Sequence, residues 1–392
     1  MKFAIVAFTN PFVDKSDGGK IDIYNRLLAL SDQQTKIDLY TILKKDEKET
    51  TCEFKNVNVY ADRVANKFKY VFNKYPLSVN NRYSNKLTRI MKEKVYDLTI
   101  FENANMIKYL DKNNIISKIN YIRIHNIESS YRKDTFKSSF PKLTSILEGI
   151  EGMKYKNIEN NYINKFSKFL FISKDEQNEY IKLFPKYKEK FIWVPPVIEC
   201  NKYVDYNAIE DNTILFYGDM TISHNFEGIK WFCKKVFPKV LYKNPNVILN
   251  IVGKISSYDR QYLSKACNNI NVLGYVENID KTISKAAIVI APIFHGAGVK
   301  IKVLHALSKG KILVATEKAI EGTYLKDKEH LFIGKDADEF TKLCLKILSN
   351  SKKYIYAAEN ALKYLKQNHS IKSQSELLYN LYKEDIKIKN II

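Results

Sequence analysis

The sequence lacks any apolar run of 18 residues, the length at which a stretch becomes a candidate membrane-spanning helix. The first apolar run carries a single early charge and ends at Asn10 and Pro11, which favours a first β-strand over a signal peptide. These two absences predict a cytoplasmic protein. The expected membrane contact is peripheral, at the inner face of the cell membrane.

Cysteine is scarce, with five residues spread over the chain: Cys52, Cys200, Cys233, Cys267 and Cys344. Their number is odd, and they lack the paired spacing of a zinc site. The pattern therefore predicts reduced thiols, not a disulfide framework or a metal centre.

Acidic residues are in deficit, because 43 Asp and Glu face 64 Lys and Arg and leave a formal charge of +21. This excess favours anionic partners, such as nucleotide sugars, phospholipid surfaces, nucleic acids or acidic polymers. The sequence has no RNA-binding motif, so nucleic acid is disfavoured, and it has no internal repeat beyond the two α/β halves and no low-complexity tract. The 392 residues, 45% of them hydrophobic, are enough for two domains with separate cores.

The segment Lys285–Gly322 has the pattern of a strand, a glycine-rich loop, a helix and a second strand. An apolar run at 286–291 precedes Gly296 and Gly298, and helical apolar spacing then continues to Gly310. The loop thus falls at the carboxyl end of a strand. In open parallel sheets, ligands bind at that edge.

The loop has the chemistry of a phosphate site. Glycine lets the backbone approach an anion, and a helix N-terminus offers free N–H groups and partial positive charge. Lys300 and Lys302 add charges that oppose the helix dipole unless an anion compensates them. A solvated basic helix start would give the same pattern, so the loop alone leaves both interpretations open.

This segment resembles the donor-binding segment of retaining GT-B glycosyltransferases of the glycosyl transferases group 1 type. The family pattern is Gly-x-Gly-x-Arg/Lys-x-Lys-x-Leu-Glu-Ala, and residues 296–306 read Gly-Ala-Gly-Val-Lys-Ile-Lys-Val-Leu-His-Ala. Gly310, Thr316 and Glu321 match later positions of the same pattern. The departure is His305, where the family has a glutamate that accepts hydrogen bonds from the nucleotide ribose.

Two places in the first half extend the resemblance. Gly18 and Gly19 follow the first predicted strand, like the family's Gly-Gly loop near the donor phosphate and acceptor. His125 follows a predicted strand in the run His-Asn-Ile-Glu and resembles the active-site histidine beside the transferred sugar. Taken without the resemblance, the histidine could equally be packed or solvent-exposed.

The resemblance implies two sets of site residues. His125 and Lys300 form the expected catalytic set. The expected donor-binding set is Gly18, Gly19, Gly218, Asn225, Gly253, Lys254, Tyr275, Val276, Gly296, Ala297, Gly298, Val299, Lys302, His305 and Glu321. The lysines would stabilise the departing diphosphate electrostatically. No metal ion and no cofactor beyond the nucleotide sugar is expected.

Apolar runs and helical spacing alternate along the chain, which predicts two doubly wound, Rossmann-like α/β domains. The predicted strands are 3–8, 37–42, 57–60, 97–101, 120–124, 169–173, 191–194, 213–217, 247–252, 272–276, 286–291 and 312–315. Pro195 and Pro196 mark a break where the family has its interdomain linker. We expect an acceptor-side domain at 1–196, a donor-side domain at 197–368 and a helix at 369–392. The GT-B fold implies that the domains face each other across a cleft and that this helix crosses back to the first domain.

One basic and aromatic stretch, residues 63–94, matches the family weakly. A solvated face with aromatic anchors would give this composition. An acceptor-binding or membrane-facing surface would also combine basic and aromatic side chains. RNA binding uses the same composition but has no motif here.

The resemblance implies a retaining, metal-independent hexosyltransferase. The enzyme would move a sugar from a nucleotide sugar to a glycan, lipid-linked or protein acceptor, in surface polysaccharide, glycolipid or glycoprotein synthesis. A nucleotide-sugar 2-epimerase shares the fold but needs carboxylates poised for acid–base work. A non-catalytic GT-B protein that binds a glycan or protein is a third interpretation, which His305 keeps open.

Overall fold

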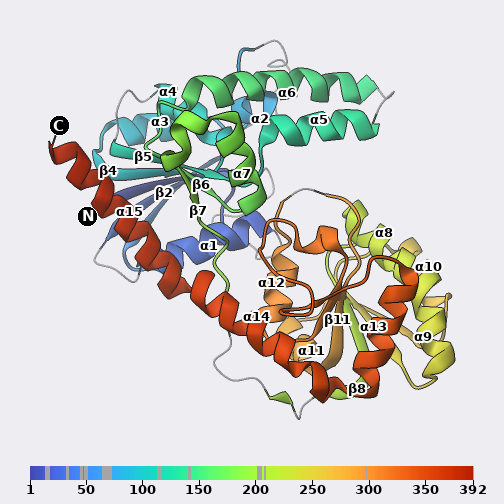
Figure 1. Cartoon of the computed structure of the whole chain (residues 1–392). Helices are drawn as coiled ribbons and strands as arrows, with labels where there is room; N and C mark the ends of the chain where they lie inside the picture. Colours follow the sequence, from blue (N-terminus) through green and yellow to red (C-terminus); the bar gives the residue numbers. More distant parts are fainter. Residues whose placement is uncertain are drawn as a thin grey trace. The chain divides into compact units, whose positions relative to one another are not determined.

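The computed structural model describes residues 1–13, 18–31, 35–44, 47, 52–63, 73–112, 117–139, 143–200, 205–206, 209–296 and 298–391. The chain forms two compact units, Met1–Val197 with Ile371–Ile392, and Ile198–Ser370. Each unit is a parallel β-sheet with apolar cores formed against helices (Figure 1). The first unit therefore contains segments from both ends of the chain.

Within the described residues, the sheet of the first unit has seven parallel strands in the order β3-β2-β1-β4-β5-β6-β7. Their bounds are β1 Lys2–Ala7, β2 Lys36–Leu43, β3 Val57–Arg63, β4 Tyr96–Phe101, β5 Ser117–Ile124, β6 Lys168–Phe171 and β7 Phe191–Trp193. The central strands are apolar and buried along almost their whole length, as a sheet covered on both faces requires. The strand order reverses beside β1, where β4 continues the sheet on the other side.

Helices on both faces bury this sheet. Helices α1 (Gly18–Ser31) and α15 (Ile371–Ile391) share one core with the sheet, in which Leu27 and Tyr379 are buried. The second core involves α2 Leu77–Asn80, α3 Asn85–Lys92, α4 Ile107–Lys112, α6 Leu143–Tyr162 and α7 Lys174–Leu183. Helix α5 (Glu128–Ser139) packs along α6 (Figure 1).

The second unit has six parallel strands within the described residues, in the order β10-β9-β8-β11-β12-β13. Their bounds are β8 Glu210–Tyr217, β9 Ile248–Val252, β10 Ile270–Gly274, β11 Ala286–Ala291, β12 Leu313–Ala315 and β13 Phe332–Ile333. The helices are α8 Ser223–Trp231, α9 Phe237–Lys243, α10 Ser257–Ser264, α11 Ile279–Lys285, α12 Ile301–Ser308, α13 Ala337–Ser349 and α14 Ile355–Asn368, with a π-helical turn at Phe232–Val236. One apolar core involves α8, α9, α10 and α13, the other involves α11 and α12, and α14 contributes to both.

The prediction of two doubly wound α/β domains and a C-terminal helix is confirmed, with local corrections. The strand predicted at 272–276 ends at Gly274, so Tyr275 and Val276 lie beyond it. The strand predicted at 169–173 ends at Phe171, because Ser173 instead caps α7 and accepts the Glu176 N–H. The short strand β13 was not predicted. In the described part of the chain, no helix combines the length and apolarity that crossing a membrane requires.

Candidate functional site

Loops at the carboxyl ends of β8 and β9 meet in the second unit. Gly218 follows β8 and Gly253 follows β9, both with positive φ angles, +155° and +132°. The Gly218 N–H donates to Val252 O at 3.0 Å, and the Gly253 N–H donates to Gly274 O at 2.8 Å. A Cβ atom on Gly253 would lie 1.9 Å from Gly218 O. Only glycine therefore permits this close approach of the two loops.

The glycine loop after β11 is held by Lys300. Gly296 and Gly298 have φ angles of +100° and +74°. Lys300 is 7% exposed, and its Nζ donates to Gly296 O at 3.1 Å and to Gly298 O at 2.7 Å. Lys300 occupies the N-cap position of α12, one residue before the predicted first turn. Its ammonium thus fixes the shape of the loop. Ala297 lies outside the described residues, and Val299 packs against the apolar core.

Lys302 points its ammonium into the same group of loops. Its Nζ donates to Asn225 Oδ1 at 2.6 Å and lies 4.6 Å from the centre of the Phe216 ring. Among the described residues, no carboxylate forms an ion pair with Lys302. Burial, together with the nearby charge of Lys300, lowers the pKa of Lys302 to about 7. This environment disagrees with a solvated basic helix start and favours an anion as the missing partner.

His224 lies beside the same loop but was not in the predicted set. A Cβ atom on Gly296 would lie 3.0 Å from His224 Nδ1, so the imidazole lines the loop. Burial lowers the pKa of His224 to about 4, with further contributions from Lys302 and Lys300. The ring is therefore neutral at pH 7. In the sequence, His224 stands directly before Asn225, a predicted donor-binding residue, and this neighbour was the signal that could have identified it. A histidine at the start of a helix does not by itself indicate a function.

His305 makes polar contacts through both ring nitrogens. Nε2 lies 2.9 Å from Asp280 Oδ1, and Nδ1 lies 3.3 Å from the hydroxyl of Tyr217. The Tyr217 hydroxyl donates its proton to Lys302 O at 2.5 Å, so its oxygen is an acceptor for His305. Hydrogen bonding to His305 lowers the pKa of Asp280 to about 2 against the effect of burial, and Lys309 adds to this. His305 is therefore held between Asp280 and Tyr217 within the second unit.

The remaining predicted donor residues are more exposed. Glu321 follows the 3₁₀ turn after β12 and pairs with Lys318 at 2.6 Å. Lys254 has an exposed side chain, and its carbonyl accepts the Met220 N–H at 2.8 Å. Tyr275 is 82% exposed, whereas Val276 packs against the apolar core. The unit itself therefore holds Glu321 and Val276, whereas the side chains of Lys254 and Tyr275 extend into solvent.

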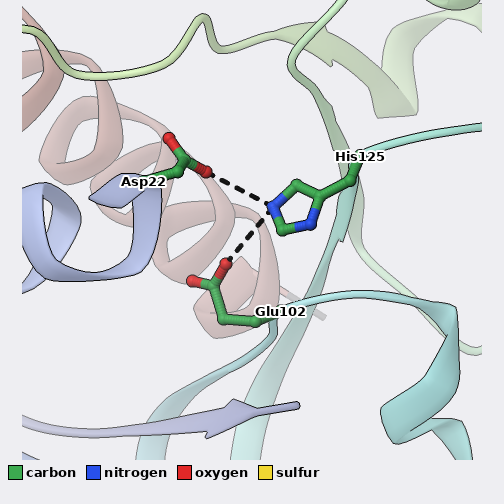
Figure 2. Close-up of side chains that lie close together, drawn as sticks. All are labelled: Asp22, Glu102 and His125. Carbon is green, nitrogen blue, oxygen red and sulfur yellow. Dashed lines mark ion pairs between the residues drawn. The ribbon is translucent and has the colours of Figure 1, made fainter. Parts of the chain in front are cut away.

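The first unit places His125 directly after β5, where it meets two carboxylates (Figure 2). Nε2 of the ring lies 3.3 Å from Asp22 Oδ2 and 3.9 Å from Glu102 Oε2. The His125 side chain is 12% exposed, and its ring packs edge-on against Phe8 at 5.6 Å. Gly18 and Gly19 begin α1, the helix that carries Asp22. Asp22 and Glu102 were not in the predicted site.

Two buried arginines hold the carboxylates. Arg26 Nε donates to Glu102 Oε1 at 2.6 Å, and Arg26 Nη2 pairs with Asp22 Oδ2. Arg123 Nε and Nη2 donate to the two oxygens of Asp22, each at 3.2 Å. Burial alone would raise the pKa of Asp22, but Arg123 and Arg26 hold it far below its usual value. Both carboxylates therefore have fixed positions.

The spacing of these groups bears on metal binding. One ligand atom each from Asp22, Glu102 and His125 lie within 4.8 Å of one another, which could hold a metal ion. However, Arg26 already bonds to both carboxylates and Arg123 bonds to Asp22. A divalent ion would enter beside two buried positive charges and compete for the same oxygens. The donor set therefore fits a metal ion poorly.

Part of the basic and aromatic stretch at 63–94 lies outside the described residues, namely 64–72. In the described part, Lys94 turns inward, with Nζ 3.0 Å from Asp38 Oδ2 and 3.9 Å from the centre of the Tyr60 ring. Tyr75 is buried in the apolar core. These two side chains are structural anchors of the first unit.

Solved structures of proteins that act on sugars share this fold. WaaG, a glycosyltransferase involved in lipopolysaccharide biosynthesis, gives a TM-score of 0.68 at 14% identity, covering 97% of this chain and 99% of its own. HepE from Anabaena, solved with UDP and glucose, gives 0.63 at 15% identity and covers 97% and 98%. Sucrose-phosphate synthase from Thermosynechococcus elongatus gives 0.72 at 13% identity and covers 99% of each chain. These likenesses show the GT-B fold.

The family comparison adds the class of enzyme. Residues 211–350 match the family model described as glycosyl transferases group 1. An uncharacterized 44.6 kDa protein in the cps region of Klebsiella pneumoniae is 28% identical over 402 residues, which cover 98% of this chain and all of the relative. The fold is that of GT-B glycosyltransferases, and the family match over residues 211–350 supports a glycosyltransferase. Its second unit carries the group 1 glycosyl transferase domain, which confirms the resemblance of the glycine loop.

Proposed function

We propose that the protein transfers a hexose from a nucleoside-diphosphate sugar to a glycan or lipid-linked acceptor, with retained anomeric configuration and without a metal ion. The Lys302 ammonium is the observation that carries this proposal. It is partly buried beside the glycine loop, and no described carboxylate neutralises it. A diphosphate is the anion that such a loop and helix N-terminus suit best.

In the proposed reaction, the bond between the anomeric carbon and the diphosphate oxygen breaks, and the acceptor oxygen bonds to that carbon. The nucleoside diphosphate leaves with the electron pair, and the acceptor hydroxyl passes its proton to the departing diphosphate oxygen. Lys302 and the N–H groups of the loop stabilise this developing negative charge. Because lysine supplies the positive charge, the proposal includes no metal ion. His125 of the first unit is proposed to contact the transferred sugar.

Surface polysaccharide is the proposed product class. The Klebsiella pneumoniae relative is described by its place in the cps region, and WaaG by its role in lipopolysaccharide biosynthesis. HepE was solved with UDP, which makes a UDP-sugar the first donor to test. The formal charge of +21 suits peripheral contact with an anionic membrane that carries a lipid-linked acceptor.

A two-stage experiment tests the proposal. A thermal-shift panel of nucleotide sugars identifies the donor, because a ligand that binds the folded state raises the unfolding temperature. Transfer is then assayed with lipid-linked and free glycan acceptors, with and without EDTA, and the product's anomeric configuration is read by NMR. Transfer that requires an added metal ion, or that inverts the configuration, contradicts the finer proposal. Epimerised donor without transfer, or binding without any turnover, would instead support the epimerase or the non-catalytic alternative.

A further inference from the structure

The cluster around His125 has a balanced charge and one carboxylate oxygen without a hydrogen bond. Asp22 and Glu102 are matched by Arg26 and Arg123, so the four side chains carry no net charge. Glu102 is 0% exposed. Its Oε1 accepts from Arg26, but its Oε2 has no hydrogen-bond partner among the described residues and lies 3.9 Å from His125 Nε2. A buried oxygen of this kind favours a donor beside it.

The two nitrogens of His125 have different surroundings. Nε2 faces Asp22 Oδ2 at 3.3 Å and Glu102 Oε2 at 3.9 Å, and neither contact has the full geometry of a hydrogen bond. Ionised carboxylates only accept hydrogen bonds, so a lone pair on Nε2 would face two negative oxygens. Nδ1 makes no hydrogen bond with any described residue. The surroundings therefore favour a proton on Nε2, and in a neutral imidazole the lone pair then lies on Nδ1.

The arginines keep this arrangement in place. Burial alone would raise the pKa of Asp22, but Arg123 and Arg26 hold it low, so Asp22 remains an acceptor at any pH of interest. Arg26 joins Asp22 to Glu102, because its guanidinium bonds to one oxygen of each carboxylate. The Glu102 N–H also donates to Val6 O at 2.9 Å, which anchors the end of β4 to β1. Neither carboxylate can turn away from the imidazole without breaking an ion pair.

We propose that Asp22 and Glu102 are positioning residues that hold His125 as the neutral Nε2–H tautomer. The lone pair of Nδ1 is then free to accept a hydrogen bond from a hydroxyl group of the sugar or acceptor. This role rests on the proposed function for its substrate. The tautomer itself does not depend on turnover and can be measured in the resting protein.

The first test is the natural protein, labelled with ¹⁵N-histidine and studied by long-range ¹H–¹⁵N NMR. The His125 signal is assigned by its absence from His125→Asn. We expect a protonated, pyrrole-type Nε2 and an unprotonated, pyridine-type Nδ1. A proton on Nδ1 alone would overturn the inference without any variant having to fold.

The second test is Glu102→Gln. Its amide oxygen can still accept from Arg26, but its NH₂ group would then face Nε2, so the tautomer should reverse. Turnover should fall roughly 10- to 100-fold while the KM for the donor changes by less than about 2-fold. Asp97→Asn is the matched control, because Asp97 lies at the amino end of the same strand, bonded to Lys2 N and Lys118. It should change neither the tautomer nor turnover.

The outcomes separate this inference from the proposed function. An inactive natural protein with the Nε2–H tautomer would refute the proposed function and support the tautomer assignment. An active protein whose folded Glu102→Gln form keeps full turnover and the same tautomer would refute the inference alone. Selective broadening of the His125 signal by Mn²⁺ would also refute it, since a metal ion on Nε2 displaces the proton.

Discussion

The two units differ in whether a carboxylate compensates their buried positive charges. In the second unit, no described carboxylate pairs with Lys302, and the ammonium contacts an amide oxygen and an aromatic ring. In the first unit, Arg26 and Arg123 are fully buried, and each bonds to a carboxylate. An uncompensated cation favours an anionic ligand. A compensated one holds neighbouring groups in place.

This contrast predicts opposite effects on stability when one charge is removed. Breaking a buried pair leaves its partner uncompensated, which destabilises a protein strongly. Removing a cation that has no carboxylate partner relieves the cost of its desolvation instead. Stability measurements can therefore distinguish a ligand site from a positioning network before any substrate is known.

The largest expected effect is that of Arg123→Met, which leaves two buried carboxylates with one arginine. The free energy of unfolding of the first unit should fall by about 3–5 kcal/mol. Urea denaturation followed by circular dichroism measures this, with the two units fitted as separate transitions. Lys118→Met is the control, because its pair with Asp97 is exposed and should contribute less than about 1 kcal/mol. Equal stability of both variants would contradict the charge network.

The next effect concerns turnover by His125→Ala. Because the imidazole is proposed to act on the sugar in the transition state, turnover should fall roughly 10- to 1000-fold. Calorimetry should show nearly unchanged affinity for the nucleoside diphosphate, which the second unit is proposed to bind. A variant with full turnover would remove His125 from the site.

Lys302→Met should separate binding from stability. Loss of the charge should weaken nucleoside-diphosphate binding at least about 10-fold, the scale of one charge-assisted contact. The unfolding temperature of the free protein should stay the same or rise, since a poorly compensated cation is removed. Calorimetry and thermal unfolding measure the two effects, with Lys243→Met as an exposed control outside the predicted site. A lower unfolding temperature with unchanged affinity would reverse the interpretation of Lys302.

The pH dependence of binding should follow Lys302, whose pKa is lowered to about 7 from an ordinary value of 10.5. In the free protein, the folded state gains stability as pH rises from about 7 to 10, because the unfolded chain holds the proton more tightly. A bound diphosphate favours the ammonium, so binding at pH 8 should take up part of a proton. Calorimetry in buffers of different ionisation enthalpy measures this uptake, which Lys302→Met should abolish.

The smallest effect is expected for His305→Glu, which restores the residue usual in the family. The new carboxylate would lie beside Asp280. The attractive contact between His305 and Asp280 would become a repulsion between two carboxylates, worth about 0.2–1 kcal/mol. Nucleotide affinity should therefore fall slightly or stay the same, and Asp280→Asn in the same chain should restore it. Tighter binding by the single variant would indicate a decayed site rather than an adapted one.

Local sequence patterns predicted the architecture and the glycine loop well. Buried parallel strands are continuous apolar runs, and loops that need positive φ contain glycine, as at Gly253 and Gly296. The end of β10 was less predictable, because Tyr275 is as typical of a strand as of an exposed turn. Strand ends depend on which backbone groups find partners, and that is a property of the neighbouring strand.

The positioning network could not be predicted, because its members come from separate segments. Asp22 lies on α1, Glu102 follows β4 and Arg123 lies on β5, and only the parallel sheet brings these segments together. The bonds from Lys300 to Gly296 and Gly298 are local, yet the sequence suggested a ligand contact because a lysine near glycines suits a phosphate equally well. For the carboxylates and for Lys300 alike, the role depends on which group the side chain contacts, and the sequence does not specify that group.

The division of the chain has a consequence for biosynthesis. The core of the first unit includes Leu378 and Tyr382 of α15 beside Phe3 of the first strand. When the ribosome has made residues 198–370, the whole second unit exists as one continuous segment, while the first unit still lacks its last helix. Because domains generally fold as units, the inner segment can be completed first. The unit that begins the chain is therefore the last to finish.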